Sequence, residues 1–203
     1  MGNNTYWVIF IMTYGKYKNA RNASWQCLID NNVRVLPVKV TEIAINNGIL
    51  IQRYSTVEPD RLKPNESGST YIFDDKIVIV YRDSEPSQRC RFTIAHELGH
   101  IFLGHTLIDG KYARKFDLSK PEIEIEADVF ASRLLAPACV LWGLNLHTAD
   151  EIAKVCNISL SAGKVRAERM RVLYEHNKFL TSPLEQHVFK QFEGFIQSKQ
   201  NNI

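Results

Sequence analysis

The sequence has few cysteines and lacks the cysteine spacing of metal ribbons and disulfide-rich domains. Its four cysteines lie far apart and include no C-x-x-C pair; they are Cys27, Cys90, Cys139 and Cys156. This spacing excludes a zinc ribbon and a dense disulfide framework, so we expect reduced and mostly buried thiols. The chain does not need such cross-links, because 203 residues with 45% apolar content are enough to bury a core.

Long apolar runs and a surplus of one charge are also missing. The stretch that most resembles a targeting segment, residues 6–12, is too short to span a bilayer, and no Lys or Arg precedes it. We read it as a buried strand or the start of the first helical layer. The 25 basic and 22 acidic residues are too balanced to predict binding to nucleic acid or to a membrane surface. We therefore expect a cytoplasmic protein without membrane contact.

The predicted elements run in the order helices, small sheet, helices, which is typical of an α+β fold. Helices are predicted from apolar residues near helical spacing, from prolines at their starts and from stop signals such as Asn46-Asn47-Gly48. The predicted helices cover residues 16–31, 38–47, 87–105, 121–135, 148–156, 160–174 and 183–196, and the predicted strands cover 49–51, 71–73 and 76–81. The sequence shows no repeats, so we expect one mostly helical unit around a small sheet.

The helix expected after Pro86 contains the pattern H-E-x-x-H, from His96 to His100. Residues four apart project from the same face of a helix, so the two histidines can present their imidazoles to one metal ion. Glu97 lies beside them and can take a proton from a metal-bound water that attacks a carbonyl, then deliver it to the leaving amine. The pattern alone is only moderately specific, but its flanks are strongly apolar. Buried histidines and a buried carboxylate need a partner, and a metal ion supplies one.

A catalytic zinc site needs three protein ligands and an open position for water, so one more donor is expected downstream. Three side chains are candidates: His105, Glu124 and Glu126. The extended metzincin pattern requires histidine at position 106, where the chain has Thr106, so His105 is out of register. The alternative is a glutamate from the helix that Pro121 opens.

We choose Glu124 as the third ligand. It shares a helical stripe with the small residues Ala127 and Ala131, which permit close approach to the H-E-x-x-H helix, whereas Glu126 points away. Asp128 follows on the same stripe and can accept the second ring N–H of a ligating histidine. Without the histidine motif, these acids would read as a solvated helix start. The predicted site comprises His96, His100 and Glu124 as ligands of one zinc ion, Glu97 as catalytic base and acid, and Asp128 behind a ligand.

Two segments of the chain together resemble the ImmA/IrrE family of zinc metallopeptidases. They are R-F-T-I-A-H-E-L-G-H at 91–100, followed by L-G-H at 103–105, and E-I-E-A-D-V-F-A-S-R-L-L-A-P at 124–137. Weaker similarity extends from about residue 36 to 195. The resemblance implies a gluzincin-like fold with two histidines and a glutamate on zinc. It also implies a protease that acts inside bacteria on a repressor of a prophage, mobile element or stress response, and so a helix-turn-helix repressor as substrate.

Residues 148–166 look like a helix-turn-helix with basic residues on its second helix; these are Lys164, Arg166, Arg169 and Arg171. Such residues can reach phosphates, but similar helix pairs also serve as plain packing, and two glutamates interrupt the charge. We expect no specific DNA binding. The chain is accordingly divided into a zinc metallopeptidase domain over 1–145 and a C-terminal helical extension over 146–203 packed on it.

The alternative function comes from a different class, a DNA- or protein-binding regulator with a structural or idle metal site. The presence of Glu97 argues against it, because a structural site has no use for an acid next to its ligands. Two residues are candidates for stabilising the oxyanion of the reaction, His105 and Tyr81. The sequence does not choose between them.

Overall fold

The computed structural model describes residues 18–73, 76–105, 107–108, 111–112 and 121–201. The first elements in this part of the chain are helices α2 (Lys18–Asp30) and α3 (Val40–Asn46), as the apolar spacing predicts. The stretch at 6–12 lies outside the described residues. The central elements are strand β1 (Leu50–Arg53), the short helices η1 (Tyr54–Thr56) and η2 (Pro59–Arg61), and strands β2 (Gly68–Phe73) and β3 (Lys76–Tyr81).

These strands form a three-stranded sheet in the order β1-β3-β2. The middle strand β3 runs parallel to β1 and antiparallel to β2, with Gly68 opposite Tyr81 and Phe73 opposite Lys76. The centre of β3 is buried, which matches its unbroken apolar sequence from Ile77 to Val80. Among the described strands, β2 pairs with β3 alone and so lies at the edge of the sheet. The structure is mostly helical with this small sheet, which confirms the predicted α+β class.

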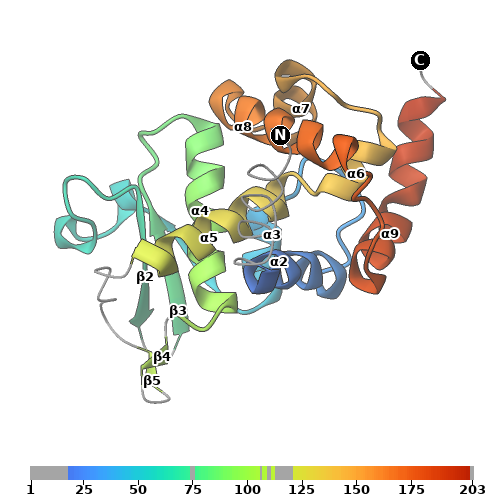
Figure 1. The fold of residues 1–203 in the computed structure, drawn as a ribbon. Coiled ribbons are helices and arrows are strands. Elements are labelled where there is room, and N and C mark those ends of the chain that lie inside the picture. The colour runs from blue at the N-terminus through green and yellow to red at the C-terminus, as the bar shows by residue number, and fades with distance from the viewer. Residues whose placement is uncertain (1–17, 74–75, 106, 109–110, 113–120, 202–203) are drawn as a thin grey trace, which may run out of the picture.

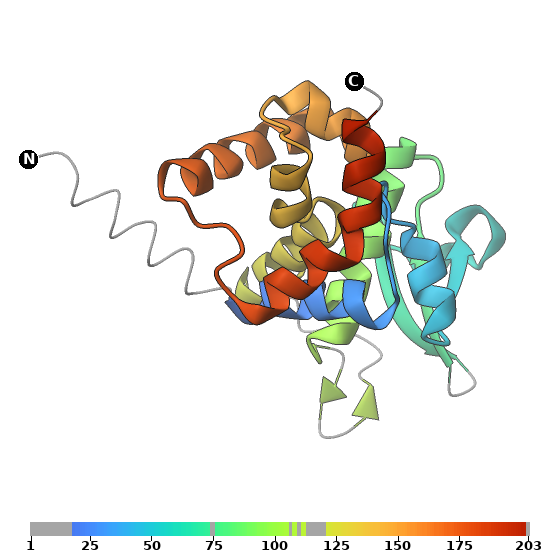
Figure 2. The ribbon, with the colours of Figure 1, turned by 90° about the vertical axis from the view of Figure 1, so that its right-hand side faces the viewer.

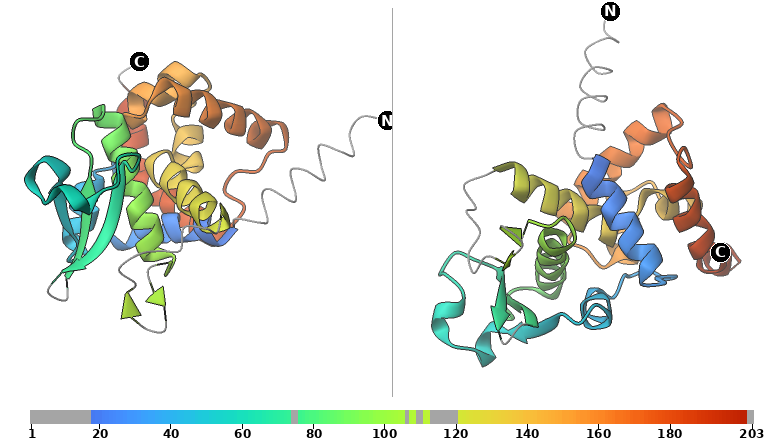
Figure 3. Two further views of the ribbon diagram at one scale, coloured as in Figure 1. Left: turned by 90° about the vertical axis from the view of Figure 1, so that its left-hand side faces the viewer. Right: turned by 90° about the horizontal axis from the view of Figure 1, so that it is seen from below.

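Two helices occupy the centre of the molecule, α4 (Ser87–Phe102) and α5 (Pro121–Leu135). Helix α4 packs against β2 and β3 on one side and against α5 on the other, while α2 packs on α5 (Figures 1 and 3). The contacts are apolar: Leu98 from α4 and Phe130 and Leu134 from α5 are fully buried in one core. Each such side chain contributes about 1.5–3 kcal/mol on burial. The core therefore fixes α4 against α5.

The predicted helix after Pro86 is shorter than expected at its end. It stops at Phe102, and Gly104 has a positive φ of 74°, a conformation that glycine adopts readily. The backbone N–H of His105 then bonds the carbonyl of His100 at 2.9 Å. The chain thus folds back over the last turn of α4. Two short strands follow, β4 (Leu107–Ile108) and β5 (Lys111–Tyr112), which pair antiparallel to each other.

The C-terminal part adds α6 (Ala138–Gly143), α7 (Ala149–Cys156), α8 (Leu160–Glu175) and α9 (Pro183–Gln200). Only α6 was not predicted from the sequence, because six residues are too few to show a helical period. Side-chain caps start the others; Thr148 and Glu151 form a capping box on α7, and Ser159 caps α8. Figure 2 shows α9 lying across α6 and α2, against which it packs. The division of the chain at residue 145 remains a prediction.

The basic residues of α8 do not form one continuous exposed row. Arg166 is only 4% exposed. Arg171 is paired with Glu168 at 2.6 Å and with Glu175 on the same helix. This arrangement favours the packing role of the helix pair α7 and α8, and the absence of DNA binding stays a prediction.

Two further expectations concern compartment and membrane. All four cysteines are free thiols, and three of them are buried. In the part of the chain that the structure describes, no helix combines the length and the apolar character needed to cross a bilayer.

Candidate metal centre

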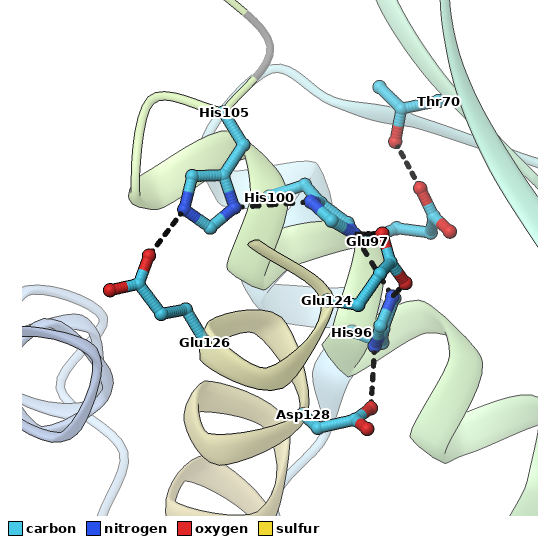
Figure 4. A network of polar contacts seen from close by, with 8 residues as sticks. All are labelled: Thr70, His96, Glu97, His100, His105, Glu124, Glu126 and Asp128. Carbon is cyan, nitrogen blue, oxygen red and sulfur yellow. Dashed lines mark hydrogen bonds and ion pairs between the residues drawn. The ribbon is translucent and has the colours of Figure 1, made fainter. Parts of the chain in front are cut away.

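The two histidines of the H-E-x-x-H motif lie on the face of α4 that meets α5 (Figure 4). Their Nε2 atoms are 3.0 Å apart. The His100 residue is 2% exposed, and the side chain of His96 is 16% exposed. Two ring nitrogens directed at each other over this distance need either a proton or a cation between them. The pair is therefore arranged to share one positive ion.

Glu124 approaches the same point from α5. Its Oε2 lies 3.2 Å from His96 Nε2, and its Oε1 lies 3.3 Å from His100 Nε2. Oε1 is buried and accepts no hydrogen bond from any described residue. A tetrahedral zinc ion with ligand distances of about 2.0–2.1 Å holds its ligand atoms roughly 3.3 Å apart. The three side chains form a group that can hold a metal ion, and their spacing fits zinc.

Glu126, the other glutamate considered as a ligand, points to a different place. Its Oε2 contacts His105 Nε2 at 3.1 Å, and His105 Nδ1 lies 3.1 Å from His100 Nδ1. His105 thus stands behind His100 and not beside its metal-facing nitrogen. Both ring nitrogens of His105 are engaged in this chain of contacts, which leaves neither for a substrate oxyanion.

A close crossing of the two helices brings Glu124 within reach of the histidines. A side chain added at Gly99 would place its Cβ 3.1 Å from the Cα of Ala127 and 3.2 Å from the Cβ of Phe130. Such contacts are tighter than packed side chains normally make, so glycine and alanine are the residues that fit at this crossing. Ala127 and Ala131 are fully buried. This confirms the prediction that small residues on α5 permit close approach.

Each histidine is held through its Nδ1 atom. His96 Nδ1 contacts Asp128 Oδ1 at 2.9 Å, as the spacing of Asp128 predicts. His100 Nδ1 contacts His105, which contacts Glu126 in turn. Carboxylates behind metal-bound histidines fix the ring orientation and raise the basicity of the ligand. The second of these supports was not foreseen in the sequence, because the predicted helix ran through Gly104 to residue 105, whereas the chain turns at Gly104.

We expect the two supporting carboxylates to affect metal affinity rather than metal stoichiometry. Asp128→Asn and Glu126→Gln should each weaken zinc binding by a factor of about 10–100, because the first removes the carboxylate that faces His96 and the second removes the one that orients His105 behind His100. Competition with a chelating dye measures the affinity. Glu122→Gln, an exposed change on the same helix, is the matched control and should bind zinc like the wild type. Wild-type affinity in both test variants would show that these contacts do not support the site.

Glu97 lies next to His96 in sequence but faces the sheet. Its Oε2 accepts a hydrogen bond of 2.7 Å from Thr70 Oγ1, on the edge strand β2. The strand comes this close because residue 68 is glycine, where a Cβ would lie 2.3 Å from Thr93 Cγ2. Thr70 was not identified from the sequence, since nothing in the local pattern links it to a residue 27 positions away.

Comparison with known families decides the classification of this site. Residues 55–168, more than half of the chain, match the Peptidase_M78 family, described as IrrE N-terminal-like domain. The chain belongs to this family. The matched range contains all the residues of the predicted site, and the predicted family is confirmed. No curated protein matches the chain closely enough to count as a relative.

Membership of the M78 family makes the protein a peptidase, and the charges around the histidines are consistent with a metal-dependent one. Burial lowers the pKa of His96, but its hydrogen bonds to Asp128 and Glu124 outweigh this and raise it to about 9. Burial and the charge of His96 lower the pKa of His100 to about 4. The hydrogen bond from His96 lowers the pKa of Glu124. The metal-free site thus holds one proton at the place where a cation is expected.

The M78 site opens into a cleft of about 500 Å³. Its walls are residues 65–68, which form the loop before β2 and the first residue of that strand, and the facing surfaces of α4 and α5. Glu97 lines the cleft together with the histidines. Burial raises the pKa of Glu97, against the opposing effect of the Thr70 hydrogen bond. A carboxylate with a raised pKa is a better proton acceptor near neutral pH than an ordinary one. The cleft therefore combines a group of side chains that can hold a metal ion with a carboxylate suited to accept a proton.

Proposed function

We propose that this M78 peptidase is a zinc-dependent endopeptidase that cleaves a regulatory protein. The carrying observation is the convergence of two histidine nitrogens and one glutamate oxygen within 4.8 Å of one another, in a cleft that Glu97 also lines. Bound zinc would be held by His96, His100 and Glu124, and supplies a Lewis acid that polarises the scissile carbonyl and acidifies water. We propose one zinc ion per chain.

The proton transfers fall to Glu97 in this proposal. Its carboxylate accepts a proton from the attacking water and then donates it to the nitrogen of the leaving amine. Thr70 holds one oxygen of the carboxylate at 2.7 Å, which leaves the other oxygen to receive the proton. Asp128 keeps the ring of His96 in the orientation that presents Nε2 to the metal. Thr70 and Asp128 thus position the groups that react.

The edge of the sheet and an apolar pocket support a polypeptide substrate. Strand β2 has one side unpaired among the described strands, and an extended peptide can add to such an edge through backbone hydrogen bonds. A pocket of about 430 Å³ adjoins the cleft, with Phe92 and Asp128 lining both. Its lining includes Ile125 and Val165, which are 40% and 74% exposed, together with Arg133, Arg166 and Arg169. This pocket suits a large apolar side chain of the substrate.

We further propose a transcriptional repressor of the helix-turn-helix type as the substrate, belonging to a prophage, a mobile element or a stress response. This step rests on the family resemblance and on the fit of the cleft to a polypeptide. We place the protein in the cytoplasm, for which its free thiols are the support. The alternative of a DNA-binding regulator is less well supported, because Arg166 is buried and Arg171 is paired with acids.

Removing the metal tests the proposed function. The purified protein should contain about one zinc per chain and should cleave the helix-turn-helix repressor proposed as its substrate. Dialysis against a chelator should reduce cleavage to background, and added zinc should restore it, because the three ligands remain in place. Gel electrophoresis follows the cleavage, and elemental analysis follows the metal. Cleavage that persists in protein shown to be free of metal would contradict the proposal.

A further inference from the structure

A second pocket, of about 350 Å³, adjoins the apolar pocket described above and shares Val129, Arg133, Arg166 and Arg169 with it. Arg133 of α5 lines it and follows Glu124 by nine residues, which is about two and a half turns and so the opposite helix face. Trp25 of α2 and Leu173 of α8 also line it. The charged residues of the lining are Arg21, Arg133, Arg166, Arg169, Lys178 and Glu185. Cations thus outnumber the single carboxylate five to one.

The position of Arg166 on α8 is unusual for a charged residue. The buried residues of that helix are Gly163, Arg166, Met170 and Leu173, so Arg166 occupies the stripe that faces the core. The residue is 4% exposed, and burial lowers the pKa of its guanidinium to about 10. It remains a cation at neutral pH, in a place where an apolar side chain would be expected.

Several donors lining this pocket have no acceptor. The Nε and Nη2 atoms of Arg166 and the Nε1 atom of Trp25 are buried, and no described residue accepts a hydrogen bond from them. All three are N–H groups. A ligand that satisfies them must present acceptor oxygens, and a negative charge on it would offset the guanidinium.

The neighbouring groups of the protein do not supply that charge. Glu185 accepts a hydrogen bond of 3.0 Å from the backbone N–H of Thr181, at the start of α9. Cys139 and Cys156 lie close enough to affect Arg166, but burial raises the pKa of each thiol, so both are neutral near pH 7. A buried cation left in this state is strongly unfavourable. No described residue forms an ion pair with Arg166, so an anion from solution can take that place.

We propose that this pocket binds a phosphate group, carried by inorganic phosphate or by a phosphorylated small molecule. The planar fork of Arg166 matches two oxygens of such a group, and Arg133 and Arg169 line the same pocket with further positive charge. The volume is near the lower end of the range for small-ligand pockets, which leaves room for more than the phosphate alone.

Thermal unfolding of the purified protein tests this site. The anions are inorganic phosphate, pyrophosphate and adenosine monophosphate, each compared with chloride at equal ionic strength. At about a hundred times its Kd, the bound anion should raise the Tm of the wild type by roughly 5–10 °C. A full shift with inorganic phosphate identifies the free ion as sufficient, whereas a shift only with the larger anions identifies a phosphorylated molecule.

Two variants of α8 make the test specific. Arg166→Met keeps the length of the side chain without its charge and should lose the shift, while its Tm in chloride should be no lower than that of the wild type. Arg171→Met is the control, because Arg171 is exposed and paired on the helix surface, and it should keep the shift. Phosphate that bound at the zinc site would stabilise Arg166→Met as well, so equal shifts in that variant and the wild type overturn the proposal.

Calorimetric titration of the wild type gives a result that does not depend on the folding of a variant. We expect one anion site per chain, with binding weakened by at least tenfold in Arg166→Met. Absence of a shift and of binding heat with all three anions at millimolar concentration would overturn the proposal. The metal centre and the peptidase activity are not needed for either measurement, so the outcome is independent of the proposed function.

Discussion

Replacing Glu97 by glutamine is expected to lower peptide-bond hydrolysis by a factor of about a hundred to ten thousand while zinc stays bound. The amide has nearly the shape of the carboxylate but cannot accept the proton of water. Glu97 hydrogen bonds to Thr70 on the sheet and takes no part in the histidine and glutamate group, so the three proposed ligands keep their places. Burial disfavours the charged form of Glu97, and a neutral amide at this position should therefore not destabilise the fold.

Cleavage, metal content and thermal unfolding should be measured on the same preparation of Glu97→Gln. The control is Glu122→Gln, which makes the same chemical change at an exposed position outside the cleft and should leave the rate unchanged. Full activity in a folded, zinc-loaded Glu97→Gln protein would remove Glu97 from the proposed mechanism. A binding module would then be the better account of the site.

The second large effect is expected from Glu124→Ala, which should yield protein with almost no zinc after dialysis. Glu124 is the only acid among the described residues that faces Nε2 of both His96 and His100, so its loss leaves two ligands. Two histidines alone do not make a catalytic zinc site. We expect the loss of affinity to exceed the factor of about 10–100 that is typical for a supporting carboxylate.

Glu126→Ala provides the matched comparison for this experiment. It removes the same side chain from the same helix, two residues along, and changes the net charge equally. Zinc should stay near one per chain in this variant, because Glu126 contacts His105 and not the metal-facing nitrogens. Elemental analysis after dialysis separates the two variants. If Glu126→Ala loses zinc and Glu124→Ala keeps it, the assignment of the third ligand is wrong.

Periodicity predicted the parts of the site that lie on single helices. The four-residue spacing of His96 and His100 and the stripe from Glu124 to Asp128 depend only on helical geometry. The structure brings these four side chains together as the spacing predicts. The role of Ala127 could be predicted for the same reason, since a small side chain on that stripe permits close approach to the H-E-x-x-H helix.

Contacts between distant elements could not be predicted from helical periodicity. Thr70 reaches Glu97 because the register of β2 on β3 and the glycine at position 68 bring the sheet against α4. Local sequence predicts neither the register nor the close packing that this glycine allows. His105 was considered as a ligand and as an oxyanion stabiliser. A turn centred on Gly104 instead places it behind His100, where it links that ring to Glu126.

Glu124 belongs to the first turn of α5, and this position bears on how long a metal ion stays bound. The first backbone N–H groups of a helix have no partner within it, and helix ends open and close far more often than helix centres. Each opening of that turn would withdraw one ligand of three from the ion. The residence time of a zinc ion bound as proposed would then depend on the kinetics of a fraying helix end, and a contact that holds residues 121–124 in place would prolong it.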